Sequence, residues 1–176
     1  MSIKSDILEK YNLDYMAEYG WQSNFDDETF TFGYIYSYKS NADLLINKGT
    51  LDLHIFPIIF SYRQYLELVL KNVCYKNMTR NQYIKLIRYA SHNLIKVWQN
   101  AKEFLKKNIT PKQLNEIEEI IRLFYDLDPN SYTFRYEYDK KLNRSIKNKS
   151  LIINTFELKK WMNTIDSYLR FTYDDI

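Results

Sequence analysis

Glycine and proline are scarce in this chain, and their scarcity limits its fold more than any other feature. The 176 residues include only three Gly and three Pro. Folds built from many short strands need frequent turns, and turns depend on these residue types. The sequence therefore favours long helices over a sandwich or barrel. A chain of this length suits one domain with its own core.

Apolar residues recur at intervals of three and four along most of the chain, which is the spacing of one helix face. Residues 28–47 are ambiguous, because aromatic residues there also alternate as in a strand, but the helical pattern runs longer. Pro57 is expected to open a second helix, since a proline at the first helical position loses no hydrogen bond. The predicted fold is all-α, an antiparallel bundle of about five to six helices. The pattern in these first two helices is carried by Ile35, Tyr38, Ala42, Leu45, Ile46, Ile58, Ile59, Tyr62, Leu66, Val69 and Val73.

Residues that cap helices mark further helix starts. Thr79 is placed to begin a short helix. Thr110 begins another, in which Gln113 completes a capping box and Pro111 occupies the first helical position. The last helix is expected to begin near residues 154–155.

Two segments interrupt the helical pattern. Ser91 and His92 mark either a kink or a fresh helix start. Asp128-Pro129 is expected to stop a helix, because the residue before a proline avoids the helical conformation. Around residues 131–150, aromatic and polar residues alternate at first, which predicts a short extended or hairpin segment.

No repeat or linker divides the chain, so residues 1–176 are predicted to form a single domain. Residues 1–27 are expected to be an acidic lead-in, and residues 139–150 a mobile, basic loop. The tail from Tyr173 is expected to fray.

Charge is distributed in blocks. Residues 1–30 carry two Lys against seven acidic residues, and residues 113–139 carry two Arg against seven. Residues 71–112 carry ten Lys or Arg against one Glu, and residues 140–150 carry five basic residues and no acid. A basic block attracts phosphate backbones, but it is equally typical of a solvated helix face, so both interpretations stay open.

The sequence also excludes several classes of protein. Cys74 is the only cysteine, which rules out an internal disulfide. No signal-peptide pattern or long apolar run is present, so we expect a cytoplasmic protein without a membrane segment. Phosphate-binding glycine loops and the nucleophile elbow are missing. One Cys and two His, His54 and His92, do not suffice for structural zinc, so no metal or cofactor is expected.

Five charged or titratable residues of the predicted bundle form the candidate site: Arg63, Glu67, His92, Arg135 and Asp139. Histidine transfers protons near neutral pH, and arginine stabilises the charge that builds on a phosphate. RNA supplies its own nucleophile, the 2′-hydroxyl, so these residue types suffice for metal-independent cleavage. The site interpretation requires that the five side chains meet at one open cleft.

The same residues also have structural interpretations. Arg63, Glu67 and Lys71 follow one another at four-residue intervals opposite the apolar face, where they would form ordinary ion pairs of about 0.3–0.5 kcal/mol. His92 would cap a helix or make a supporting hydrogen bond, and Arg135 would anchor a loop.

The order of the sequence elements resembles that of bacterial HEPN-like helical proteins. The matching elements are SNADLLI, PIIFSYRQYLELVLKNV, SHNLIKVWQNAKEFL and DLDPNSYTFRYEYDKK, followed by a closing amphipathic helix, and they span residues 30–170. The resemblance implies an antiparallel helical bundle, commonly a homodimer. HEPN proteins include metal-independent ribonucleases, toxins and antiphage effectors, as well as non-catalytic binding modules.

Catalytic HEPN ribonucleases carry an arginine followed a few residues later by a histidine. Here Arg88 precedes His92 with three residues between them, whereas Arg63 would meet His92 only in space. We expect His92 to be the general acid or base and Arg88 or Arg63 to stabilise the phosphate. Glu67 would orient one of them.

The leading hypothesis is a HEPN-like protein that binds or cleaves RNA in bacterial defence, toxin action or conflict with phage. The basic block would hold the RNA backbone, and the expected substrate-binding residues are Arg135, Asp139 and Lys96. Two alternatives stay open. One is a non-catalytic module that forms a homodimer or binds a partner through its aromatic surface. The other is a helical protein that holds a nucleotide.

Overall fold

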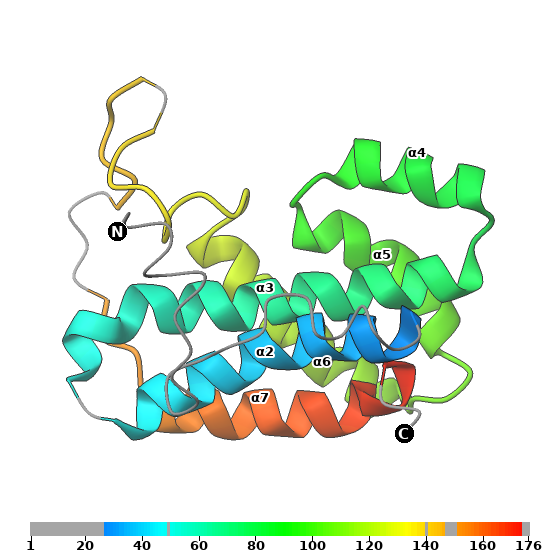
Figure 1. Cartoon of the computed structure of the whole chain (residues 1–176), viewed down its shortest axis with the longest axis horizontal. Helices are drawn as coiled ribbons and strands as arrows, with labels where there is room; N and C mark the ends of the chain where they lie inside the picture. Colours follow the sequence, from blue (N-terminus) through cyan, green and yellow to red (C-terminus); the bar gives the residue numbers. More distant parts are fainter. Residues whose placement is uncertain (1–26, 49, 140, 147–150, 174–176) are drawn as a thin grey trace, which may run out of the picture.

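Six α-helices and one 3₁₀ turn make up most of the described part of the chain, and no strand occurs there (Figure 1). The computed structural model describes residues 27–48, 50–139, 141–146 and 151–173. The predicted all-α bundle is confirmed, whereas nearly all of the predicted acidic lead-in lies outside the described residues. The elements are α2 (Asp27–Asn47), α3 (Leu51–Asn77), α4 (Arg80–Ala90), α5 (Leu94–Leu105), α6 (Pro111–Leu127), α7 (Thr155–Leu169) and the turn η2 (Arg170–Thr172).

Helix α3 is the centre of the bundle. It lies antiparallel to α2, to which a short turn joins it, and it also contacts α5, α6 and α7 (Figure 1). The apolar stripe predicted for α3 is buried, and Ile58, Tyr62 and Leu66 have no exposed surface. Burial of such side chains, worth about 25 cal/mol per Å² of apolar area, is the main force that holds the helices together. The surrounding helices contribute Ile35, Ala42, Leu94, Trp98, Ile117, Phe124, Met162 and Ile165 to the same core.

Helix α3 begins earlier in the sequence than Pro57, which was predicted to be its first residue. It starts at Leu51, so Pro57 lies inside the helix and not at its first position. An internal proline has no N–H to donate to the carbonyl four residues before it, which here belongs to Leu53. The turn before the proline is nevertheless helical, and Ile55 in this turn packs against the core.

The other predicted helix starts are confirmed. Thr79 and Thr110 cap α4 and α6, each in a capping box closed by a glutamine three residues later. Asn154 caps α7 by accepting a hydrogen bond from a backbone N–H of the first turn. These local signals were sufficient because a cap satisfies backbone donors that the helix itself leaves free.

After α6 the chain makes turns, and the predicted hairpin shrinks to one contact. Among the described residues between 128 and 146, the single strand-like pairing is an antiparallel bridge between Tyr138 and Arg144. The carboxylate of Asp139 accepts hydrogen bonds from backbone N–H groups two and four residues later (2.7 and 2.9 Å), which closes a compact turn. The mobility predicted for the basic loop stays a prediction.

The C-terminal end is packed where it was expected to fray. Tyr173 is 4% exposed, and its hydroxyl donates to the buried carboxylate of Asp166. Asp166 also accepts a hydrogen bond from the hydroxyl of Tyr65 (2.8 Å). A buried tyrosine hydroxyl needs such a partner, so the expectation of a frayed end is wrong at this residue. Residues 174–176 lie outside the described residues.

Across the helices that the structure describes, none combines the length and the apolar character that a membrane span requires.

Replacing Pro57 by alanine is predicted to stabilise the protein. The change restores an N–H for the Leu53 carbonyl, and little packing is lost because Pro57 is exposed. We expect the free energy of unfolding, measured with urea, to rise by about 1–3 kcal/mol. Pro111→Ala is the control, because Pro111 lies at the first position of α6 and its replacement should give no gain. An equal response of the two variants would contradict the prediction.

Candidate functional site

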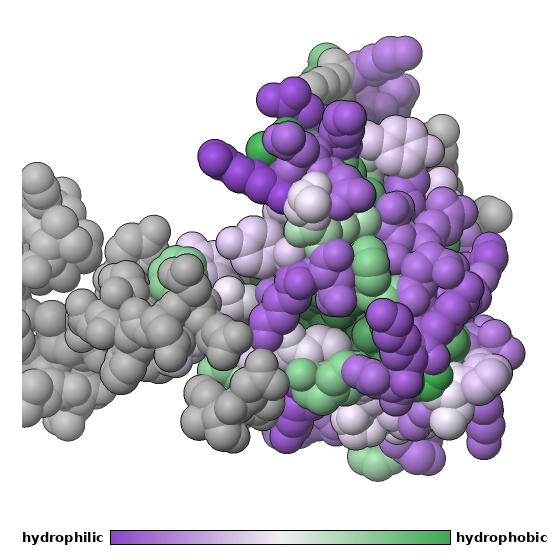
Figure 2. Space-filling view, turned by 90° about the vertical axis from the view of Figure 1, so that its right-hand side faces the viewer, coloured by the Kyte–Doolittle hydropathy of each residue, from purple (hydrophilic) through white to green (hydrophobic). Residues whose placement is uncertain are grey.

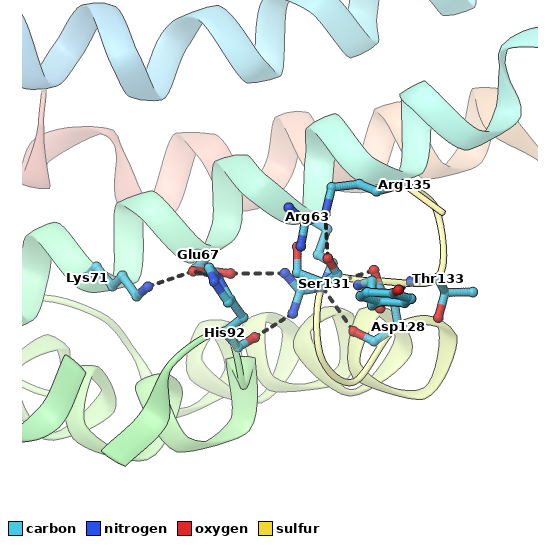
Figure 3. A network of polar contacts seen from close by, with 9 residues as sticks. Arg63, Glu67, Lys71, His92, Asp128, Ser131, Thr133 and Arg135 are labelled. Atoms are coloured by element: carbon cyan, nitrogen blue, oxygen red, sulfur yellow. Dashed lines mark hydrogen bonds and ion pairs between the residues drawn. The ribbon is translucent and has the colours of Figure 1, made fainter. Parts of the chain in front are cut away.

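Two of the candidate residues, Arg63 and Glu67, form a series with Lys71 along α3, and most of that series is buried. Arg63, Glu67 and Lys71 lie one helical turn apart (Figure 3). Arg63 is 0% exposed and Glu67 is 1% exposed. The interpretation as ordinary surface ion pairs is therefore wrong. Helices α5 and α6 contact α3, and the backbone carbonyls of His92 before α5 and Asp128 after α6 lie against Arg63 on this face.

Arg63 connects α3 to two other segments. Its Nη1 donates to Glu67 Oε2 (3.0 Å), its Nη2 to the backbone carbonyl of His92 (2.5 Å), and its Nε to the backbone carbonyl of Asp128 (3.0 Å). The planar guanidinium suits this task, because its donors point in several fixed directions. With no exposed surface and three protein acceptors, Arg63 has no room for a substrate phosphate. The expected contact of Arg63 with phosphate does not fit this geometry, so Arg63 is a positioning residue.

The carboxylate of Glu67 holds three positively charged or titratable groups. Besides Arg63, it binds Lys71 Nζ at 2.6 Å and His92 Nδ1 at 2.9 Å, both through Oε1. Burial raises the pKa of the Glu67 carboxyl, but hydrogen bonds and charges from Lys71 and His92 outweigh burial and lower this pKa overall. Glu67 is therefore ionised at neutral pH. Since a carboxylate can only accept, Nδ1 is the ring nitrogen of His92 that carries a proton.

His92 connects this buried group to solvent, because its side chain is 50% exposed. Ser91 before it has a φ of 49°, and this left-handed turn separates α4 from α5. Asn93 caps α5 by accepting a hydrogen bond from the N–H of Lys96 (3.0 Å), so the capping role weighed for His92 belongs to Asn93. Within the described part of the chain, Nε2 of His92 has no hydrogen-bond partner. This nitrogen is therefore available for proton transfer.

Asp128 forms the other end of the network. Its backbone carbonyl accepts from Arg63, and its Oδ1 accepts from the backbone N–H groups of Tyr132 and Thr133 (2.7 and 3.1 Å). Its Oδ2 is buried, 3.8 Å from Nε of Arg63, and finds no hydrogen-bond partner among the residues that the structure describes. The network thus fixes the loop after α6 against α3 (Figure 3).

Arg135 and Asp139 belong to that loop and not to the Glu67 group. Arg135 is exposed, donates from Nε to the Ser131 carbonyl (2.6 Å), and lies over the rings of Phe60 and Tyr136 (5.7 and 5.4 Å to the ring centroids). The side chain of Asp139 accepts hydrogen bonds within its own turn. The five expected side chains therefore do not meet in one open cleft.

Arg88 and Lys96 lie on either side of His92 in the sequence, and both carry a positive charge near the surface. Arg88 is exposed in the last turn of α4. The ammonium of Lys96 lies over the ring of Tyr89 (4.1 Å to the centroid). The break at Ser91 means that Arg88 and His92 do not share one continuous helix face.

Comparison of the chain with protein-family models, with curated proteins and with solved structures gives no match. The resemblance to HEPN-like proteins therefore stays a prediction from the sequence elements. Within the described ranges, no group of three His, Cys, Asp or Glu side chains is arranged to hold a metal ion.

Two members of the network were not candidate residues. Lys71 carried a signal, because it follows Glu67 at the four-residue spacing of a helical ion pair. The sequence at Asp128 predicted only the end of a helix. Its partner Arg63 lies 65 residues earlier, so no local pattern connects the two.

Arg63→Ala is predicted to lower the free energy of unfolding by about 3–5 kcal/mol, because it leaves buried Glu67 without its guanidinium partner. Arg122→Ala is the control. Arg122 pairs with Glu118 (2.7 Å) but its side chain is 63% exposed, so its loss should cost less than about 1 kcal/mol. Urea unfolding followed by circular dichroism measures both values. Equal, small losses would show that the Arg63 network contributes no more than a surface ion pair.

Proposed function

We propose that this chain binds RNA through the α4 surface, which we define as Arg80, Lys85 and Arg88 of α4 together with Lys96 in the first turn of α5. The observation that carries the proposal is the charge of this region. Residues 71–112 contain ten basic residues against one acid, and α4 contains no acid at all. Such a concentration of positive charge attracts a phosphate backbone, because binding releases the counterions held there.

The position of α4 supports this proposal. The helix stands apart from the bundle and contacts only α3 and α5 within the described part of the chain (Figure 1). Its buried residues are Leu86 and Ala90, whereas Arg80, Lys85 and Arg88 are exposed. Among the described residues, no acidic side chain pairs with any of these three cations. Their charge is therefore available to a polyanion.

Removal of charge from α4 is predicted to weaken RNA binding and its dependence on salt. We expect the variant Arg80→Ala/Lys85→Ala/Arg88→Ala to bind a short single-stranded RNA more weakly in fluorescence anisotropy. A plot of log affinity against log salt concentration should become shallower by about 2, because each phosphate contact on a single strand contributes about 0.7.

The matched control removes the same charge from other parts of the molecule. It replaces by alanine three lysines that follow α2 or lie on α7, namely Lys48, Lys159 and Lys160. This variant should keep the affinity and the salt slope of the wild type. Equal losses in the two triple variants would mean that net charge alone attracts RNA, which contradicts a specific role for α4.

A second candidate function, metal-independent cleavage of the bound RNA, is favoured by the Glu67–His92 pair. Glu67 holds Nδ1–H of the imidazole, which leaves Nε2 to accept a proton from a ribose 2′-hydroxyl. The oxygen then attacks the adjacent phosphorus. The bond between phosphorus and the 5′-oxygen breaks, the 5′-oxygen takes up a proton from solvent, and His92 later releases its own proton to solvent. The ends are a 2′,3′-cyclic phosphate and a 5′-hydroxyl. Arg88 and Lys96 are the cations that would stabilise the charged phosphate, while Arg63 would act by positioning Glu67.

His92→Ala is predicted to lower the rate of RNA cleavage by about 10²- to 10⁴-fold while leaving RNA affinity nearly unchanged. His54→Ala is the control, since His54 is the other histidine and lies in the first turns of α3. Cleavage is followed on gels with EDTA present, and a strand with 2′-deoxyribose at the cleaved position should stay intact.

The two proposals can fail separately. Salt-dependent binding by a wild-type protein that cleaves no RNA would end the cleavage proposal and leave binding in place. If wild type binds no RNA, the expected homodimeric, non-catalytic module becomes the leading hypothesis, and light scattering tests it.

A further inference from the structure

An aromatic pocket lies between α2, α3 and α4, next to the Glu67–His92 pair. Its volume is about 260 Å³. The residues that matter here are Phe30 and Tyr34 from α2, Leu68, Lys71 and Tyr75 from α3, and Tyr83 from α4.

Two pairs of rings form walls of this pocket. Phe30 and Tyr34 pack together on α2, with ring centroids 5.1 Å apart. Tyr75 and Tyr83 make an edge-to-face contact with centroids 5.3 Å apart, and this contact joins α3 to α4. The rings are not fully covered, because Tyr34 is 46% and Tyr75 is 62% exposed. The pocket therefore offers aromatic faces to a ligand from solvent.

Lys71 connects the pocket to the candidate catalytic pair. Its side chain lines the pocket, and its ammonium binds the same Glu67 oxygen that lies against Nδ1 of His92. The ammonium of Lys71 and the imidazole of His92 are therefore neighbours. A ligand in the pocket therefore contacts Lys71, which links the pocket to Glu67 and His92.

The surroundings of the pocket match a polyanion. Arg80 precedes Tyr83 by one turn of α4, so an exposed cation lies beside the aromatic wall. Figure 2 looks onto the end of the molecule where α2 begins and α3 ends, and it shows a band of hydrophobic residues bordered by hydrophilic ones. An apolar, ring-lined opening with one cation on its wall, Lys71, and another beside it, Arg80, suits a ligand that has both flat apolar rings and phosphates.

We infer that this pocket is a subsite for an unpaired base of the bound RNA, adjacent to the phosphate that faces His92. The inference rests on the proposed RNA binding and adds a preference for single strands. A base stacks on aromatic rings through its face and leaves its edges free for polar groups, here the tyrosine hydroxyls and Lys71. An aliphatic protein segment would offer the tyrosine hydroxyls at the opening no hydrogen-bond partner. A base in a duplex cannot enter, because both of its faces are already stacked.

The test uses the full chain and a short single-stranded oligoribonucleotide. A set of matched strands carries an abasic site at one position at a time. In the wild type, removal of the base at one position should weaken binding by roughly tenfold, the order expected for one stacked base. Tyr34→Ala should weaken binding of the intact strand by a similar factor. Removal of that base should then have no further effect on the variant.

Tyr36→Ala is the matched control. Tyr36 lies on the same helix, is 48% exposed against 46% for Tyr34, and does not line the pocket. It should bind intact and abasic strands as the wild type does. Tyr75→Ala tests the opposite wall independently, and because Tyr75 is 62% exposed its loss should not unfold the protein.

Three results would overturn the subsite: no abasic position affects the wild type, Tyr34→Ala and Tyr36→Ala lose affinity equally, or the wild type binds duplex and single-stranded RNA equally well. In each case the salt-dependent contribution of the α4 surface would still be measurable, so failure of the subsite is distinct from failure of RNA binding. A wild type that binds no RNA of any kind would overturn both.

Discussion

The rest of the structure depends on a carboxylate that is almost completely removed from water. Glu67 is 1% exposed and ionised, and a buried ion costs several kcal/mol unless opposite charges and hydrogen bonds surround it. Arg63 and Lys71 supply these contacts from the same helix, and His92 supplies one from the α4–α5 junction. The junction is therefore held against α3 by the need to satisfy this group.

Helix α3 has a polar anchor for each of its main neighbours. Tyr62 donates to Asp43 of α2 (2.5 Å), and Tyr65 donates to Asp166 of α7 (2.8 Å). Arg63, between them in the sequence, reaches the end of α6 and the start of α5. Apolar contacts alone tolerate sliding and rotation of helices, whereas these directional bonds select one arrangement. Three nearly adjacent residues of α3 thus specify how the bundle is assembled.

The same network determines what reaches the surface. Arg63 and Glu67 stay inside, while the imidazole they support is half exposed beside a helix that carries only positive charge. Lys71 belongs both to the buried network and to the exposed pocket, since it binds Glu67 and lines the aromatic pocket. In the candidate site, therefore, His92 is exposed to solvent, whereas Arg63 and Glu67, which hold it in place, are buried. Changes at the buried members should alter stability and position together, whereas changes at His92 or Tyr34 act mainly at the surface.

Much of the fold followed from local chemistry. Helical spacing predicted the bundle, and Thr79, Thr110 and Asn154 marked helix starts, because caps satisfy donors within a few residues. The helix start predicted from Pro57 was wrong, because a proline favours the first position of a helix but contains no information about how the turn before it packs. The fraying predicted from Tyr173 onward was wrong at this residue, because its hydroxyl reaches its partner Asp166 only after η2 has turned the chain back.

The sequence by itself determined that this chain forms helices, where most of them begin, and that positive charge gathers between residues 71 and 112. Only the tertiary structure decided that Arg63 and Glu67 are buried and that His92 binds them. It also decided that Arg135 and Asp139 lie outside this network. The reason is that burial depends on which helices cover a face, and the contacts of Arg63 with His92 and Asp128 span 29 and 65 residues. Periodicity describes one helix at a time and contains no information about such distant partners.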